Sequence, residues 1–325
     1  MLDVRWWDPV SSARGDSNIY ALGRIGPHNV VVVGPPRGAQ GTVATAQFVS
    51  TIRLTFPNIT VGLLVGIGSG IPRYPERDVR LGDVVVGAPE KGPAVTKMVL
   101  DKPTQLLLQV VNKVETKSKY IEDEEDGLLG PHLARFSKYP RLQKETFRKP
   151  STSDRLFKIT YPHQPGSDCN THAQSTILSG GSIMKSPKDR DMLSAKHNNA
   201  LCIEMEAAGL MDVFPCLVIR GISDYADSHK NTVWQGFAAA TAAVYAREFL
   251  LNVPEQVMSD SKDGTSSIGA ARIPSPQANG AHHTPFSSHH NSGVQVGYNT
   301  GKCVITVIIH TTVLGQTVSL FLYTR

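Results

Sequence analysis

Three acidic side chains lie next to apolar stretches in the second half of the chain. Glu204 and Glu206 flank Met205 just before an apolar segment of helical character, and Asp224 follows the apolar sequence LVIRGIS. A carboxylate near a buried helix start can accept two hydrogen bonds from vicinal hydroxyls, such as those of a ribose. An aspartate in a partly desolvated pocket can serve as a general acid. The local alternatives are an acid favoured by the helix dipole at Glu204–Glu206 and a helix cap at Asp224.

A glycine-rich sequence, GIGSG, follows the apolar run VGLLV. Gly66, Gly68 and Gly70 would let the backbone approach a ligand closely and direct N–H groups at its oxygen atoms. The spacing is that of neither a dinucleotide fingerprint nor a Walker loop. A tight connection with no ligand is an equally good interpretation of these glycines.

The elements that must position these residues alternate between strand-like and helix-like patterns. Short apolar runs bounded by glycines predict buried strands, and longer segments with apolar residues at helical spacing predict helices. This alternation predicts an α/β fold, because strands and helices that alternate along the chain form layered sheets. We expect strands at 29–34, 61–65, 83–87 and 217–219, a return to the core at 177–182, and helices at 42–55, 104–117, 192–197 and 234–251.

Composition limits the classes of protein to which this chain can belong. With 325 residues, 40% hydrophobic and 19% charged, and a formal net charge of +5, it has the composition of a globular protein without a basic stripe for nucleic acid. We expect no membrane span, no metal and no cofactor, and a reducing, cytoplasmic location. Four cysteines lack metal-ligand spacing: Cys169, Cys202, Cys216 and Cys303.

Two polar segments interrupt or follow the predicted domain. Residues 119–165 form a charged excursion whose acidic run, 122–126, is interpreted as solvated rather than metal-binding. Residues 254–290 are rich in Ser, Gly, Pro, Asn and His and are predicted to be a disordered linker. Its histidine pairs are a weak indication of a metal site: His282, His283, His289 and His290. The predicted division is therefore a domain at 1–253, a linker at 254–290 and a tail at 291–325.

The motifs occur in a recognisable order. GLLVGIGSGIP, RLGDVVVG, IEMEAAGLM and CLVIRGISDYADSHKN precede an alanine-rich helix. Over residues 19–251 this set resembles the superfamily of purine nucleoside and uridine phosphorylases and methylthioadenosine nucleosidases, in particular the branch found in fungal NOD-like receptors. The resemblance implies a three-layer α/β/α sandwich with a central mixed sheet. It also implies an enzyme that cleaves the bond between a nucleobase and its ribose.

The resemblance assigns a role to each candidate residue. Asp224 would protonate N7 of the departing purine and stabilise the charge that develops on the base. Glu206 would bind the ribose hydroxyls, with Met205 packed against the sugar. The remaining assignments are Gly66, Gly68 and Gly70 on the side of the ribose and nucleophile, and Ile183 and Met184 as an aliphatic platform for the base.

The sequence departs from the family pattern in two places. Bacterial phosphorylases of this superfamily hold phosphate with an arginine just before the glycine loop, and the matching position here is Leu64. We therefore favour water over phosphate as the nucleophile, and a nucleosidase over a phosphorylase. Relatives also begin with a strand that carries a Leu-Pro and acidic element. This chain starts with MLDVR, so we expect a sheet that lacks the family's first strand.

The tail carries a second signal. NSGVQVGYNTG, at residues 291–301, fits the pattern N-x-G-x-Q-x-G-xxx-G and resembles a fungal prion-like signalling motif, and its VQVG core resembles animal RHIM amyloid segments. Alternating Val and Gln favour a strand, and Gln and Asn ladders pair along a fibril. The alternative is a strand-prone tail that matches by chance.

Two classes of function remain after this comparison. The first is a purine nucleosidase that acts as an effector in fungal immunity or programmed cell death. The second is a catalytically inactive module that assembles through its tail, which a missing first strand would favour. The resemblance also implies a homo-oligomer and homotypic amyloid partners.

Overall fold

The structure of the chain is a computed structural model. It describes residues 1–7, 10–35, 41–72, 78–88, 103–121, 127–152, 154, 156, 172–180, 183–211, 214, 216–227, 230, 232–255, 304–313 and 316–318. The four linker histidines, the acidic run at 122–126, the motif at 291–301, Cys169 and Cys303 lie outside these residues.

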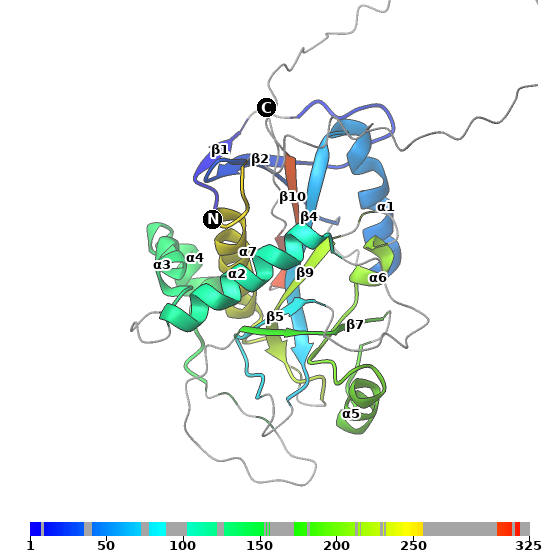
Figure 1. The fold of residues 1–325 in the computed structure, drawn as a ribbon, viewed down its shortest axis with the longest axis vertical. Helices are drawn as coiled ribbons and strands as arrows, with labels where there is room; N and C mark the ends of the chain where they lie inside the picture. The colour runs from blue at the N-terminus through cyan, green and yellow to red at the C-terminus, as the bar shows by residue number, and fades with distance from the viewer. Residues whose placement is uncertain are drawn as a thin grey trace, which may run out of the picture.

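A mixed β-sheet forms the centre of the molecule (Figure 1). Its strand order is β1-β2-β3-β10-β4-β9-β5-β6, with β8 paired to β4, β7 to β8 and β11 to β10. The strands are β1 (Val4–Trp6), β2 (Ala21–Ile25), β3 (His28–Val33), β4 (Ile59–Gly70), β5 (Val84–Gly87), β6 (His172–Ser175), β7 (Ile177–Ser179), β8 (Cys202–Glu204), β9 (Cys216–Asp224), β10 (Val304–Val313) and β11 (Gln316–Val318).

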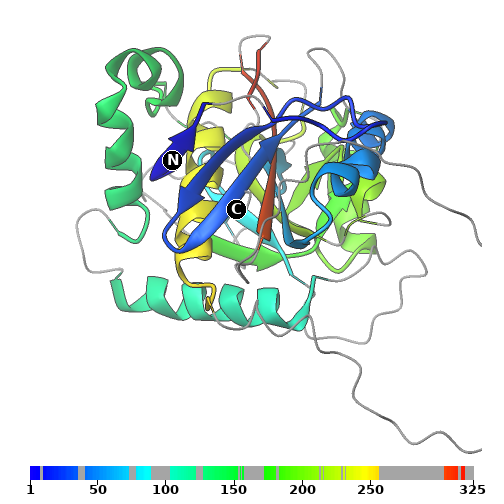
Figure 2. The same cartoon turned by 90° about the horizontal axis from the view of Figure 1, so that it is seen from above.

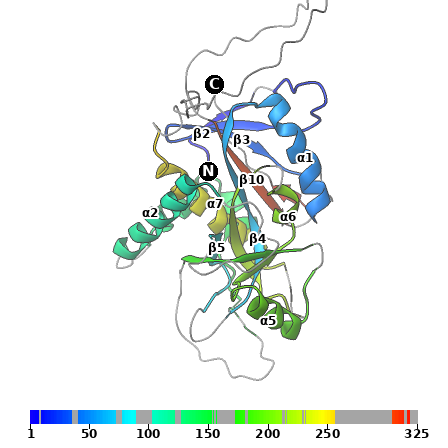
Figure 3. The same cartoon turned by 45° about the vertical axis from the view of Figure 1, so that its right-hand side comes forward.

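Helices cover both faces of the sheet, with α1 and α6 on one side and α2 and α7 on the other (Figure 3). The helices are α1 (Gly41–Thr55), α2 (Gln105–Ile121), α3 (Gly130–Leu133), η1 (Ala134–Lys138), α4 (Pro140–Leu142), η2 (Gln143–Phe147), α5 (Pro187–Lys196), α6 (Ala207–Leu210) and α7 (Gln235–Leu251). This arrangement confirms the predicted α/β class with a three-layer sandwich and a mixed sheet. No helix within the described residues is both long enough and apolar enough to span a membrane.

One hydrophobic core joins the central strands to the helices. Val31 of β3, Leu63 of β4 and Ile219 of β9 are buried in the same cluster as Phe249 of α7. The strands and the helix predicted at these positions are confirmed. The prediction worked because a strand buried on both faces must be apolar throughout. The predicted charged excursion contains the helices α3, η1, α4 and η2, of which α3 and η2 contact α7.

The glycine-rich sequence is not a turn, as one interpretation of the sequence had it. Strand β4 runs through it to Gly70. A Cβ atom on Gly68 would lie 2.5 Å from the Cys202 Sγ atom, and one on Gly70 would lie 2.7 Å from Ile222 Cγ2. Glycine is required because neighbouring strands approach β4 closely here.

The sheet has no vacant position between β3 and β4. Strand β10, from the C-terminal tail, lies between them and is parallel to both. Figure 2 shows β10 in red beside the blue strands β2 and β3. Part of the tail, Val304–Val313, therefore forms a strand, as the sequence predicted. However, the sheet that was expected to lack a strand contains a central strand from the far end of the chain.

Candidate functional site

The carboxyl end of β4 brings the candidate residues together. Strand β9 is parallel to β4, and Asp224 at its end is in register with Ser69. Strand β8 is antiparallel to β4 and places Ile203 in register with the same Ser69. Glu204 and Asp224 therefore flank the end of β4. Ligands of open α/β sheets bind at this edge, beyond the carboxyl ends of the strands.

Arg220 lies four residues before the end of β9 and contacts two of the acids. It is fully buried within β9, and its Nη2 atom donates to a carboxylate oxygen of Glu204 and, over 3.3 Å, to Oε2 of Glu206. Glu204 also accepts hydrogen bonds from the backbone N–H groups of Glu206, at 3.0 Å, and Ala207, at 3.0 and 3.1 Å. Glu204 thus binds the helix start, which was the alternative considered for this pair.

Glu206 is in a different environment. It precedes α6 but makes no side-chain capping bond there, and the residue is only 7% exposed. Burial raises the pKa of its carboxyl group to about 7, with a further contribution from the charge of Glu204, although Arg220 acts in the opposite direction. Near neutral pH, a small change in its surroundings therefore decides whether Glu206 is charged.

Two of the three guanidinium nitrogens of Arg220 make no hydrogen bond within the described residues. Its Nε and Nη1 atoms have no hydrogen-bond partner within the described part of the chain, although both atoms are buried. A buried donor without a partner is costly, about 1–3 kcal/mol, and charged donors cost more. These two N–H groups are therefore available to a polar ligand atom.

Asp224 is held by three donors. Its carboxylate accepts from the Ser223 hydroxyl at 3.0 Å, from the Ala226 backbone N–H at 3.0 Å and from the Lys230 ammonium at 3.0 Å. Lys230 also donates to Ser69 Oγ at 3.2 Å and so connects the ends of β4 and β9. Ala226 has a φ of +53°, a strained conformation for a residue with a side chain.

Arg190 of α5 fixes the turn after Asp224. The residue is buried, and its Nη1 atom donates to the backbone carbonyl of Tyr225 at 2.7 Å. The hydroxyl of Tyr225 donates to both carboxylate oxygens of Asp154, at 2.7 and 2.8 Å, which connects the turn to the charged excursion. Asp224 therefore lies in a rigid frame, as a residue that acts on a bound substrate requires.

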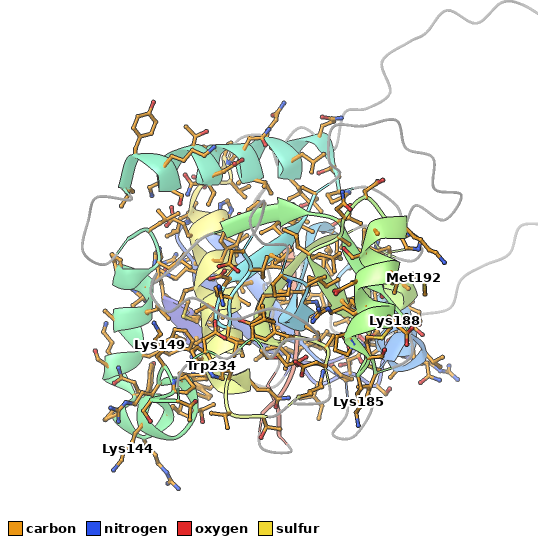
Figure 4. All side chains as sticks on the ribbon, turned by 90° about the horizontal axis from the view of Figure 1, so that it is seen from below. Lys144, Lys149, Lys185, Lys188, Met192 and Trp234 are labelled. Carbon is orange, nitrogen blue, oxygen red and sulfur yellow. The ribbon has the colours of Figure 1, made fainter. Side chains whose placement is uncertain are left out.

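The other predicted residues lie around this centre at different depths. Met205 is half-buried between the two glutamates. Met184 packs against Ile203 and Ala226, whereas Ile183 is 55% exposed. Figure 4 views the molecule from the end where α5 lies and shows Lys185, Lys188 and Met192 close together there.

The sequence interpretation missed three polar residues of this edge: Arg220, Lys230 and Arg190. Arg220 was detectable, because an arginine inside an apolar strand requires a buried acidic partner. Leu64, at the position that matches the phosphate-binding arginine of bacterial phosphorylases, is fully buried in the middle of β4.

Within the described residues, no three His, Cys, Asp or Glu side chains are grouped so that they could hold a metal ion. Cys202 lies beneath Gly68, and burial raises the pKa of its thiol. It is therefore a packing residue rather than a nucleophile.

Comparison with known protein families finds one match, in the C-terminal part. Residues 278–303 match the SesB domain on fungal death-pathway proteins. The matched segment includes the predicted motif at 291–301 and ends one residue before β10 begins.

The domain itself is similar to parts of larger proteins. A nucleotide-binding leucine-rich repeat (NLR)-like protein of Hyaloscypha variabilis is 34% identical over 290 residues, which cover 79% of this chain and 28% of that protein. The ATP nucleosidase Cap17 of Escherichia coli is 32% identical over 24% of this chain and 16% of its own length. A 5'-methylthioadenosine/S-adenosylhomocysteine nucleosidase of Bacillus velezensis is 34% identical over 26% of this chain and 38% of its own length. This chain thus spans between 16% and 38% of the length of these three relatives.

Among solved structures, the chain is similar to the 5'-methylthioadenosine/S-adenosylhomocysteine nucleosidase of Neisseria meningitidis. The identity is 16% and the TM-score is 0.48, over 77% of this chain and 90% of that one.

Proposed function

We propose that this protein cleaves the N-glycosidic bond of a purine nucleoside or nucleotide, with water rather than phosphate as the nucleophile. The observation that supports this proposal most is the buried Arg220, which contacts Glu206 and retains two unpartnered N–H groups. Arg220 belongs to β9, the strand that Asp224 ends. Acceptors for sugar hydroxyls, donors for a water oxygen and an acid for the base are the groups that this reaction needs.

Each group has one task in the proposed reaction. Glu206, once ionised, accepts hydrogen bonds from the two ribose hydroxyls. The bond between ribose C1′ and the purine nitrogen breaks, its electron pair moves into the base, and Asp224 delivers a proton to N7. Water, held by the N–H groups of Arg220, adds to C1′ and releases a proton to the solvent, from which Asp224 regains the proton that it gave to N7. Lys230 contacts the Asp224 carboxylate and holds it beside the end of β4.

The test is base release measured by chromatography from adenosine, inosine, methylthioadenosine and ATP, with and without phosphate. We expect release without phosphate, and a decrease of at least about 100-fold in kcat for Asp224→Asn. Asp189→Asn, an exposed aspartate on α5, is the matched control and should retain activity. Release that requires phosphate would indicate a phosphorylase, and release unaffected by Asp224→Asn would contradict the proposed acid.

We further propose a cytoplasmic effector role in fungal immunity or programmed cell death. The match of residues 278–303 to the SesB domain and the similarity to an NLR-like protein support this role. In this proposal, the RHIM-like motif at 291–301 assembles with copies of itself and so gathers the catalytic domains. No nucleic acid, membrane or cofactor takes part, and the domain itself forms a homo-oligomer.

The SesB match also favours a second candidate, a catalytically inactive module that acts through assembly alone. The same chromatographic assay distinguishes the two. A folded protein that releases no base from any of the four substrates would support the inactive module, with function in the tail.

A further inference from the structure

The position between β3 and β4 is filled from a distant part of the chain. Val304 through Ile308 of β10 are in parallel register with Asn29 through Val33, and Ile305 through His310 with Val61 through Gly66. Across the part of the chain that the structure describes, β3 and β4 do not pair with each other. Strand β10 is therefore the only backbone connection between the β1–β3 ribbon and the rest of the sheet in that part.

An empty position between β3 and β4 would be energetically unfavourable. Val31 and Val32 of β3, and Leu63 and Leu64 of β4, are buried in one core. Two parallel strands that face each other across an open gap would each leave a row of N–H and C=O groups without partners. The tail sequence VITVIIHTTV suits the position, because a central parallel strand is apolar and β-branched.

We propose that the gap between β3 and β4 is a strand-binding site, that its occupant is Val304–Val313 of the same chain, and that this occupancy prevents assembly of the adjoining motif. The occupant is tethered to α7 through residues 256–303. Binding of a tethered strand is intramolecular and depends on an effective concentration of the order of 1 mM, not on a permanent fold contact. The strand is therefore able to leave and return.

Docking is incompatible with stacking for a geometric reason. The SesB match ends at residue 303, and Val304 is already paired with Asn29 and Ile59. The folded domain is thus attached to the end of the motif without a spacer. Stacked copies of a motif repeat about every 4.8 Å along the fibril axis. A domain of about 250 residues, in contrast, has a radius of gyration of about 18 Å. Neighbouring domains would collide.

Release of β10 removes this obstacle. The domain would then be attached only through residues 256–277, which can span up to about 70 Å when extended. Release also affects the candidate site, because β10 pairs with β4 as far as Gly66 and β4 continues to Ser69. The exclusion of assembly rests on the proposed assembly function, whereas the strand-binding site does not.

The first experiment tests the strand-binding site in the full chain by hydrogen exchange. We expect amides of 304–313 to exchange at least about 100-fold more slowly than those of a free peptide of the same sequence. Amides of 29–33, in the neighbouring strand β3, should be protected to a similar degree. Val307→Pro, which removes a donor from mid-strand, should abolish this protection and weaken that of β3 and β4. Leu320→Pro, farther along the tail, is the matched control. Rapid exchange at 304–313 in the unaltered protein would overturn the site.

The second experiment tests the exclusion. Fibril formation is followed with thioflavin T after seeding with a synthetic peptide of residues 278–303. We expect Val307→Pro to shorten the lag at least about tenfold relative to the unaltered chain and Leu320→Pro. The double variant Val307→Pro with Val296→Pro should not assemble, which separates motif stacking from general aggregation. An unchanged lag in Val307→Pro would overturn the exclusion. A failure of every protein to assemble would contradict the proposed assembly function and the exclusion with it, while the exchange result still decides the strand-binding site.

Discussion

Two buried glutamates of this molecule have opposite electrostatic environments. Glu248 of α7 is 3% exposed and accepts hydrogen bonds from Lys117 at 2.6 Å, His132 at 2.7 Å and Asn252 at 2.8 Å. Burial alone would raise its pKa, but these three donors outweigh it and hold the pKa at about 2. Glu206 is similarly buried, yet its pKa is about 7.

The difference separates a structural cluster from a site. The donors around Glu248 come from α2, α3 and the end of α7, so a fully paired carboxylate holds these helices together. At the sheet edge, one guanidinium serves both Glu204 and Glu206 and still has two unpartnered N–H groups. A network that is only partly satisfied is unfavourable for stability, and such networks mark positions where a ligand completes the pairing.

Removing the guanidinium should have the largest effect. Arg220→Met leaves two buried carboxylates next to each other without a counter-charge. We expect a loss of about 3–5 kcal/mol in the free energy of unfolding, measured by urea denaturation at pH 7. Arg190→Met is the control, since its carboxylate partner Asp191 is half exposed and the loss should be smaller. A loss below about 1 kcal/mol for Arg220→Met would break the comparison.

The paired glutamate should contribute more to stability than the site glutamate. Glu248→Gln leaves Lys117 and His132 without their carboxylate and should cost about 2–3 kcal/mol. Glu206→Gln replaces a carboxyl group whose pKa burial raises to about 7, so it should cost less than about 1 kcal/mol. The effects on ligand binding should be in the opposite order. In calorimetric titration with a nucleoside analogue, the affinity should fall at least about tenfold in Glu206→Gln and stay unchanged in Glu248→Gln. Equal stability losses in the two variants would contradict the assignment.

The pH dependence of stability should carry both signatures. Glu206 has a raised folded-state pKa, so its contribution is complete below pH 4.5 and is lost as the pH rises to about 7. Glu248 has a lowered pKa, so its contribution is complete above pH 4.5 and is lost as the pH falls towards about 2. Each contribution should amount to about 3 kcal/mol. Urea titrations from pH 3 to 8 should therefore show the decline above pH 4.5 disappear in Glu206→Gln and that below pH 4.5 disappear in Glu248→Gln.

The sequence predicted the strands of the fold better than their partners. Val61–Val65 and Leu217–Ile219 are apolar throughout because both strands are buried on two faces, so composition alone reveals them. The β-branched tail was equally visible as a strand. Its position between β3 and β4 was not, because no local feature states which of two distant strands a third one joins.

The same limit applies to the candidate site. Glu204 and Glu206 have the same residue type and similar neighbours in sequence, and the local pattern allowed either ligand binding or a helix-start role. The fold separates them, since Glu204 ends β8 and reaches the N–H groups of α6 while Glu206 does not. Asp224 was found from the end of its strand, but its contact with Lys230 depends on the path of the chain after β9.

Packing beneath the site should have a smaller effect than the loss of Arg220 or of the Glu248 carboxylate. Gly68→Ala places a Cβ atom 2.5 Å from Cys202 Sγ, with Ile203 O at 3.2 Å and Arg220 Cβ at 3.3 Å. We expect a loss of about 1–2 kcal/mol, because β4 and β8 must separate slightly. Cys202→Ala removes the shortest contact, so the double variant should recover at least about 0.5 kcal/mol relative to additivity. Additive losses in urea denaturation would mean that the strands, not the thiol, resist the new methyl group. The close approach of β8 to β4 would then be fixed by the backbone alone. The different environments of Glu204 and Glu206, which depend on this approach, would be fixed in the same way.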